Sequence, residues 1–150
     1  MVSVDILKGL DVFDDLPERD LTAIAKMSDA VECPSGTAVF RENDDAGKLY
    51  VLLTGKAAIH FEVGRHQEAV VHSVAPGQAF GWSALVQPYR FTASAKCMED
   101  SRVLAVDREG LRRLIEEDCR VGFVIMEKLA GIISRRLRDT RIQLISMIHG

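Results

Sequence analysis

The segment best suited to chemistry covers residues 76–86, PGQAFGWSALV, and an arginine, Arg90, follows it at a short distance. A glycine-containing turn leads here into a single possible helical turn. Such a turn points backbone N–H groups outward and places positive dipole at one spot, which suits an anion. A nearby arginine can complete the site with charge-assisted hydrogen bonds. The pattern therefore predicts a site for a phosphate or another small anion.

Other reactive side chains form no comparable pattern. The four histidines are scattered over strand-like or terminal positions, so we expect no metal site. The three cysteines are odd in number and widely spaced, which favours reduced packing residues over disulfides. The sequence contains no nucleophile with a paired base and no Gly-x-Ser-x-Gly motif. We therefore expect a protein without catalytic residues, metal or cofactor.

Composition sets the class of protein. Hydrophobic residues make up 47% and charged residues 27% of the 150 positions, which is typical of one globular domain. The acidic N-terminus has no signal-peptide pattern, and no apolar run reaches the ~20 residues of a membrane span, so we expect a cytoplasmic protein. The net charge of -3 leaves no basic excess, so we expect no direct binding to DNA.

Three regions of different periodicity must position the anion site. Residues 1–30 have helical spacing of apolar side chains, with Pro17 where a helix can begin. Residues 31–107 alternate short apolar runs with turn-forming residues, which predicts strands and turns. The expected strands cover residues 37–41, 48–54, 57–63, 68–74, 92–98 and 102–106. Short strands at this spacing, without helices between them, favour a jelly roll or a barrel.

Residues 108–150 are again helical, with one helix expected over 108–117 and a longer one over 121–148, separated by a bend near Cys119. The long helix carries a heptad pattern, called the heptad stripe here: Ala130, Ile133, Leu137, Thr140, Leu144 and Met147. This stripe can pack on its own domain or on a second copy. A helix of ~28 residues is about 42 Å long, against a radius of gyration of ~15 Å for such a domain, which favours a homodimer. Four arginines of the helix are expected to form a solvated basic face: Arg135, Arg136, Arg138 and Arg141.

The pattern Phe-Gly-x-x-Ala-Leu at residues 80–85, followed by an arginine and a small-residue strand, resembles the phosphate-binding cassette of the cyclic-nucleotide-binding domain family. Residues 34–40, 49–56, 76–77, 103–107 and 111–115 resemble other strands, turns and a helix of that family. The similarity covers the chain from Leu7 to about Thr140.

The resemblance implies an α+β, mainly β fold in a single domain, a double-stranded β-helix or jelly-roll β-roll of about eight strands. Helices would occupy residues 1–30, the roll residues 31–107 with its cassette at 80–95, and further helices residues 108–150, ending in a long dimerisation helix. This arrangement is similar to the sensor domain of catabolite-activator-type regulators without their DNA-binding domain.

The resemblance also implies ligand contacts. The residues concerned are Gly81, Trp82, Ser83, Ala84, Arg90, Thr92, Ala93 and Thr140. Gly81 matches the cassette glycine, and Ser83 and Ala84 match positions whose backbone amides face the cyclic phosphate. Thr92, which opens the small-residue strand with Ala93, matches a position that often offers a hydroxyl to the phosphate. Thr140 matches the threonine that contacts the purine across the dimer in catabolite-activator-type members, and it can equally be a small residue easing helix contact.

Two departures from the family pattern leave open which ligand binds. The family's glutamate, which accepts a hydrogen bond from the ribose 2′-hydroxyl, is Trp82 here, and an indole cannot accept that bond. Trp82 can stack on a base or simply fill the cavity. The family's arginine aligns with Phe91, so Arg90 lies one residue early. It either reaches the phosphate through a bulged loop or points away from the pocket.

Two kinds of function follow. The first is a stand-alone sensor that binds a cyclic mononucleotide, cAMP or cGMP with cAMP favoured, and shifts its long helix. The second is a scaffold whose site no longer binds cyclic nucleotides, and which binds a protein partner or another small anion. Because the sequence ends at Gly150, just past the helix, we expect the signal to pass through the homodimer or to a separate output protein.

Overall fold

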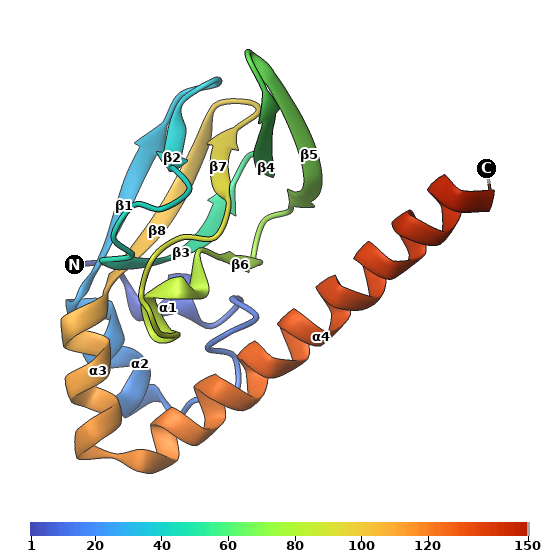
Figure 1. The fold of residues 1–150 in the computed structure, drawn as a ribbon. Helices are drawn as coiled ribbons and strands as arrows, with labels where there is room; N and C mark the ends of the chain where they lie inside the picture. The colour runs from blue at the N-terminus through green and yellow to red at the C-terminus, as the bar shows by residue number, and fades with distance from the viewer. Residues whose placement is uncertain (150) are drawn as a thin grey trace.

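The computed structural model describes residues 1–149, and its centre is a roll of two antiparallel sheets (Figure 1). One sheet has the strand order β1-β8-β3-β6 and the other the order β2-β7-β4-β5. The strands are β1 (Ser28–Cys33), β2 (Ala38–Phe40), β3 (Lys48–Thr54), β4 (Ala57–Gly64), β5 (Gln67–Val74), β6 (Ala79–Phe80), β7 (Ser94–Cys97) and β8 (Ser101–Asp107). This is the mainly β, jelly-roll type of fold that the sequence predicts.

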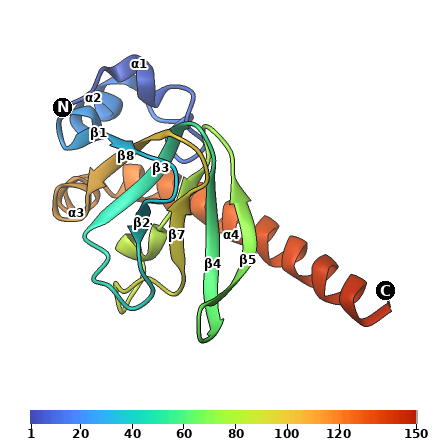
Figure 2. The same ribbon diagram turned by 90° about the horizontal axis from the view of Figure 1, so that it is seen from above.

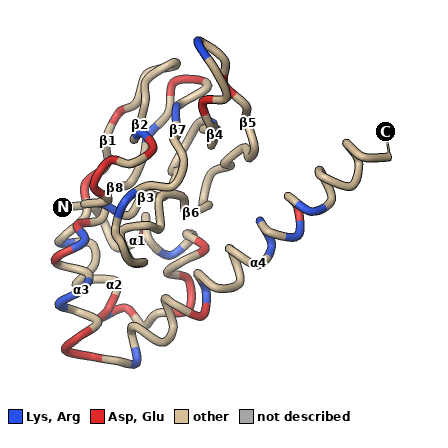
Figure 3. The backbone as a smooth tube through the Cα atoms, in the orientation of Figure 1, with Lys and Arg blue, Asp and Glu red and all other residues tan. Residues whose placement is uncertain are grey.

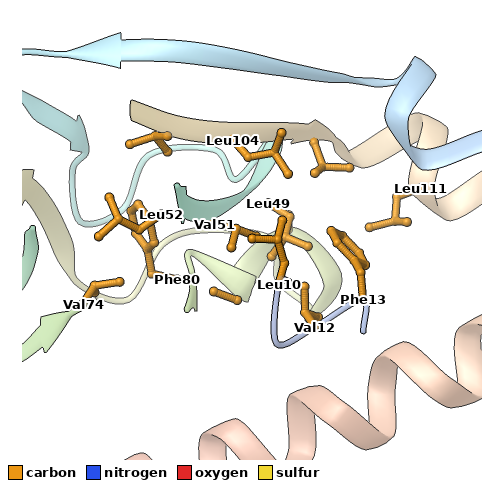
Figure 4. Close-up of a cluster of buried hydrophobic side chains, with 14 of the residues drawn as sticks. Leu10, Val12, Phe13, Leu49, Val51, Leu52, Val74, Phe80, Leu104 and Leu111 are labelled. Atoms are coloured by element: carbon orange, nitrogen blue, oxygen red, sulfur yellow. The ribbon is translucent and has the colours of Figure 1, made fainter. Parts of the chain in front are cut away.

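The core lies where the roll meets the N-terminal segment. Helix α1 (Val4–Leu7) and helix α2 (Glu18–Lys26) are joined by a loop that inserts the fully buried side chain of Phe13 beneath β3 (Figure 4). From β3, Leu49, Val51 and Leu52 are fully buried. Helix α2 begins directly after Pro17, as the sequence predicts, because proline has a φ suited to a helix start and lacks the N–H that would go unpaired there.

The structure contains two strands that are not among the six expected, β1 and β6, and it shifts the start of β7. Strand β1 begins at Ser28, within the segment for which the sequence predicts helix, and pairs with β8 in antiparallel register. Its alternation is weak because polar residues dominate it and Val31 is exposed, so hydrophobic periodicity does not reveal it. Strand β7 begins at Ser94, two residues later than predicted, which leaves Thr92 and Ala93 in the preceding loop.

Two helices complete the chain. Helix α3 (Arg108–Glu117) starts at Asp107, whose carboxylate accepts a hydrogen bond from the Gly110 amide at 2.9 Å. After a break at Asp118, helix α4 (Cys119–His149) continues for 31 residues, about 46 Å at 1.5 Å per residue. Its first part packs on the domain and its C-terminal end projects away from the roll (Figures 1 and 2).

The buried face of α4 is not the heptad stripe. The side chains that α4 buries are Val121, Ile125, Leu129 and Ile132. All six residues of the heptad stripe are exposed, with Leu137 at 51% and Met147 at 81%. The alternative that this stripe packs on its own domain is therefore wrong.

Candidate functional site: a pocket between the cassette and helix α4

The cassette is shaped by one glycine. Gly81 follows β6 with a φ of 72° and begins a short 3-10 turn, η1 (Trp82–Leu85). A left-handed backbone of this kind costs other residues free energy. A Cβ at this position would also lie 2.9 Å from Cε2 of Phe40, closer than packing permits. Gly81 therefore fixes both the turn and its close approach to an aromatic cluster.

A cavity of about 300 Å³ opens between this turn, the strands and α4. The cassette and the loop before β7 line it with Gly81, Trp82, Ser83, Phe91, Thr92 and Ala93. The strands add Phe40, Ile59, Phe61, Val71 and His72, and α4 adds Arg136 and Thr140. Most of these side chains are apolar, and among the described residues none that lines the cavity is acidic.

Six of the eight predicted ligand residues meet in this one pocket: Gly81, Trp82, Ser83, Thr92, Ala93 and Thr140. Thr140 reaches it from α4, far away in the sequence. Ala84 lies outside the pocket lining because its side chain is fully buried in the core beneath η1. The pocket is open although Trp82 lies in its wall, so the indole does not fill it.

Arg90 takes the second of its two predicted orientations and points away from the pocket. Its Nη1 atom donates a hydrogen bond to the carbonyl of Asn43 at 2.8 Å, and its backbone pairs with Asp45. Phe91 occupies the pocket side instead, with 4% of its surface exposed. Its ring stacks on Phe40 at a centroid distance of 3.8 Å and an interplanar angle of 11°. Neighbouring positions in this extended segment face opposite ways, so the one-residue offset inverts the two roles.

The cation of the pocket comes from α4. Arg136 is half-buried, its Nη2 atom donates to the carbonyl of Ala79 at 3.0 Å, and its Cζ atom lies 4.6 Å from the centroid of the Trp82 ring. Burial lowers the pKa of Arg136, although Asp11 and Asp139 partly oppose this shift. The expectation that Arg136 belongs to a solvated basic face is wrong, whereas Arg135, Arg138 and Arg141 are exposed. Figure 3 shows the basic positions along α4 in blue.

Sequence reasoning missed Arg136 as a site residue, although one signal was available. Arg136 lies four residues before Thr140, so both share one face of a helix. The structure joins them directly, because the Thr140 hydroxyl donates to the Arg136 carbonyl at 2.8 Å. Because Arg136 precedes a predicted ligand residue by one helical turn, its side chain lies beside that of Thr140 and reaches the same cavity.

Polar groups around Arg136 connect the pocket to the strand before the cassette. The Ala79 amide donates to Oδ1 of Asp11 at 3.2 Å, while the Ala79 carbonyl accepts from Arg136. Burial raises the pKa of Asp11, and the Ala79 hydrogen bond and Arg136 oppose that rise. The Nε2 atom of His72 lies 3.4 Å from the Thr140 hydroxyl, and burial and Arg136 lower the pKa of His72. At neutral pH His72 is therefore uncharged.

The structure offers little support for other kinds of site among the described residues. Within residues 1–149 no three His, Cys, Asp or Glu side chains gather as metal ligands would. No helix in this part of the chain is long and apolar enough to cross a membrane. The cavity beside α4 is therefore the candidate site that the geometry favours.

Comparisons with known proteins identify the family of the chain. A family model described as cyclic nucleotide-binding domain matches residues 30–118, more than half of the chain. The CRP-like cAMP-activated global transcriptional regulator of Mycobacterium tuberculosis is 27% identical over 144 residues, which are 96% of this chain and 62% of that protein. The chain thus spans about three fifths of the length of this relative.

Two solved structures extend the likeness. A Geobacter metallireducens GS-15 protein, provisionally described as cyclic nucleotide-binding, matches with a TM-score of 0.82 and 32% identity, over 91% of this chain and 99% of that one. The regulatory domain of Toxoplasma gondii PKA, solved with cAMP, matches with a TM-score of 0.65 and 25% identity, over 73% of this chain and 42% of that one. From its cassette, its roll and these relatives, the chain belongs to the cyclic nucleotide-binding domain family.

Proposed function

We propose that this chain is a ligand-sensing regulatory domain that binds a small anion in the pocket and reports binding through α4. The observation that carries this proposal is that one cavity joins the cassette to the long helix. A ligand there contacts Gly81 and Ser83 on one side and Arg136 and Thr140 on the other. A cyclic mononucleotide, with cAMP before cGMP, is the ligand that the family favours.

The pocket offers two kinds of support for an anion. The backbone amides at the start of η1 have no partner one turn earlier, so they can face a negative group. Arg136 supplies the positive charge that the displaced Arg90 does not. It stacks on Trp82 and uses one of its five N–H donors on Ala79, which leaves donors for a ligand.

Arg136 can couple ligand binding to α4, because it lines the pocket and also binds β6. Its hydrogen bond to the Ala79 carbonyl fastens α4 to β6. An anion that draws the guanidinium into the pocket competes with this bond, and so changes the balance between two positions of α4. A ligand acts only through different affinities for those positions. The exposed heptad stripe lies on the same helix, so a second copy or an output protein docked there would receive the change.

A second candidate is a protein-binding scaffold that senses no nucleotide. Trp82 favours it because it replaces the acceptor for the ribose hydroxyl. An unpaired buried hydroxyl costs about 1–3 kcal/mol, which is roughly ten- to hundredfold in affinity. In this alternative the heptad stripe forms a homodimer or binds a partner, and the pocket is only a remnant.

Calorimetric titration with cAMP and cGMP, on the wild type and on Trp82→Glu, tests the nucleotide as ligand. Glutamate restores the acceptor, so we expect cyclic nucleotide affinity to rise about ten- to hundredfold in the variant. Trp82→Leu is the matched control, because it also removes the indole but supplies no hydrogen-bond acceptor. If neither protein binds a nucleotide and no other anion shifts the melting temperature, the scaffold is the better account.

A further inference from the structure

Arg136 is a cation without a direct ion-pair partner, although Asp11 and Asp139 act on it electrostatically. It is half-buried, and its two close contacts are a neutral carbonyl and an aromatic ring. Within residues 1–149 it takes part in no ion pair, whereas Arg102, Arg108 and Arg120 all do. Partial burial of a charge is unfavourable, and Asp11 and Asp139 offset that cost only in part, without an ion pair to the guanidinium. A bound anion would remove that cost.

The rest of the pocket is unsuited to a highly polar ligand. Its walls are the side chains of Phe40, Ile59, Phe61, Val71 and Phe91, together with the indole of Trp82. With His72 neutral and no acidic side chain in the lining, Arg136 is the single full charge. The cavity of about 300 Å³ is at the lower end of the ~300–1,000 Å³ range of drug-sized ligand sites.

We propose that this pocket binds a small aromatic monocarboxylate, with its carboxylate on the guanidinium of Arg136 and its ring among Phe61, Trp82 and Phe91. This inference rests on the proposed function, because it names the ligand of the same site. A planar guanidinium binds a carboxylate through two parallel hydrogen bonds, which an aryl acid can provide. A flat ring fits between aromatic and branched walls without needing hydrogen-bond partners.

The same features disfavour a nucleoside. A nucleotide brings ribose hydroxyls and polar base edges, which lose their hydrogen bonds to water on entering the pocket. With no carboxylate in the lining, the remaining side-chain partners among the described residues are the hydroxyls of Ser83, Thr92 and Thr140, the ring of His72 and the indole N–H of Trp82. A monocarboxylate has a single polar group, and Arg136 satisfies it.

The test is a calorimetric titration with phenylacetate and, as its uncharged counterpart, phenylacetamide. We expect saturable phenylacetate binding with a Kd of about 1 mM or tighter, and phenylacetamide binding at least about tenfold weaker because the charge-assisted hydrogen bonds are lost. Arg136→Gln should weaken phenylacetate about ten- to hundredfold. Arg135→Gln, the neighbouring exposed arginine, is the matched control and should leave the affinity unchanged.

Trp82→Glu adds a variant that separates the two ligand classes. A glutamate beneath the guanidinium would pair with Arg136 and compete with either anion, but only a nucleotide gains the hydrogen bond from its ribose hydroxyl. Phenylacetate affinity should therefore fall relative to that of cAMP in this variant. Equal binding of phenylacetate and phenylacetamide, or of phenylacetate to wild type and Arg136→Gln, overturns the assignment of the charge. If cAMP binds and phenylacetate does not, the monocarboxylate is wrong and the sensor stands. If neither cAMP nor phenylacetate binds, the result contradicts both the monocarboxylate and the sensor.

Discussion

Replacing Gly81 by alanine tests the shape of the cassette. The new Cβ would lie 2.9 Å from Cε2 of Phe40, 3.1 Å from Cε1 of Phe91 and 3.1 Å from Cδ2 of Tyr50. These rings cannot easily move aside, because Phe40 and Phe91 are stacked on each other and Tyr50 and Phe80 stack beside them. The substitution therefore strains both the backbone and the aromatic cluster.

The expected magnitude has two parts. A residue other than glycine in a left-handed conformation costs about 1–2 kcal/mol. Forcing an extra methyl group into a well-packed cluster costs about 1–3 kcal/mol more. Gly81→Ala should therefore lower the free energy of unfolding by roughly 2–5 kcal/mol, which at ~2–4 °C per kcal/mol is a clear fall in Tm for a chain of this length.

Urea unfolding followed by circular dichroism measures this loss, and Gly36→Ala provides the control. Gly36 has a φ of 83°, but a Cβ there would meet no atom within 4 Å. Gly36→Ala should therefore lower the free energy of unfolding only by the cost of the left-handed backbone, about 1–2 kcal/mol. Equal losses in the two variants would refute the claim that the aromatic cluster is packed against the cassette turn.

Three further predictions concern His72, the two faces of α4 and the offset arginine. Because the pKa of His72 is lowered in the folded state, the unfolded state binds a proton at His72 more readily. The free energy of unfolding should therefore fall as the pH drops through about 6.5. His72→Gln should make that fall smaller, and urea midpoints measured above and below this pH would show the difference. Leu129→Ala should cost about 2–5 kcal/mol at any protein concentration. Leu137 is exposed, so Leu137→Ala should change the stability of a monomer little. If the heptad stripe pairs two copies, the variant should instead lose stability in a concentration-dependent way, and light scattering should show a smaller fraction of dimer. Exchanging Arg90 and Phe91 should destabilise the fold by several kcal/mol in thermal melts, because it buries a guanidinium in the stack on Phe40; an unchanged Tm would contradict the stacking.

Local sequence patterns predicted much of the fold for physical reasons. Strand β3 carries apolar residues between turn signals, and α3 begins at a good N-cap, Asp107. Strand β1 was missed because polar residues such as Asp29 and Glu32 give it no clear period, and its pairing with β8 defines it. A strand set by a distant partner leaves little trace in its own residues.

Part of the candidate site could be predicted from local sequence and part could not. Gly81, Trp82 and Ser83 are adjacent in sequence, so a motif places them together. Arg136 enters the pocket only because α4 folds back beneath β6, and its local sequence is that of an ordinary basic helix. The outward turn of Arg90 depends on its contact with Asn43, which lies 47 positions away. Neighbouring residues allow the outward orientation of Arg90, but they do not reveal that Arg136 enters the pocket.

The most direct test of the pocket as a sensor is a residue-resolved NMR titration of the isotopically labelled protein with cAMP and, separately, with phenylacetate. The account predicts that the backbone amide signals of Gly81, Ser83, Thr92 and Thr140 shift together and saturably with at least one of these anions. Shifts in the cassette and in α4 at the same ligand concentration would show that both sides of the pocket respond to one ligand. If none of these four signals moves with either anion at millimolar concentration, the pocket does not bind such anions and the central claim is contradicted.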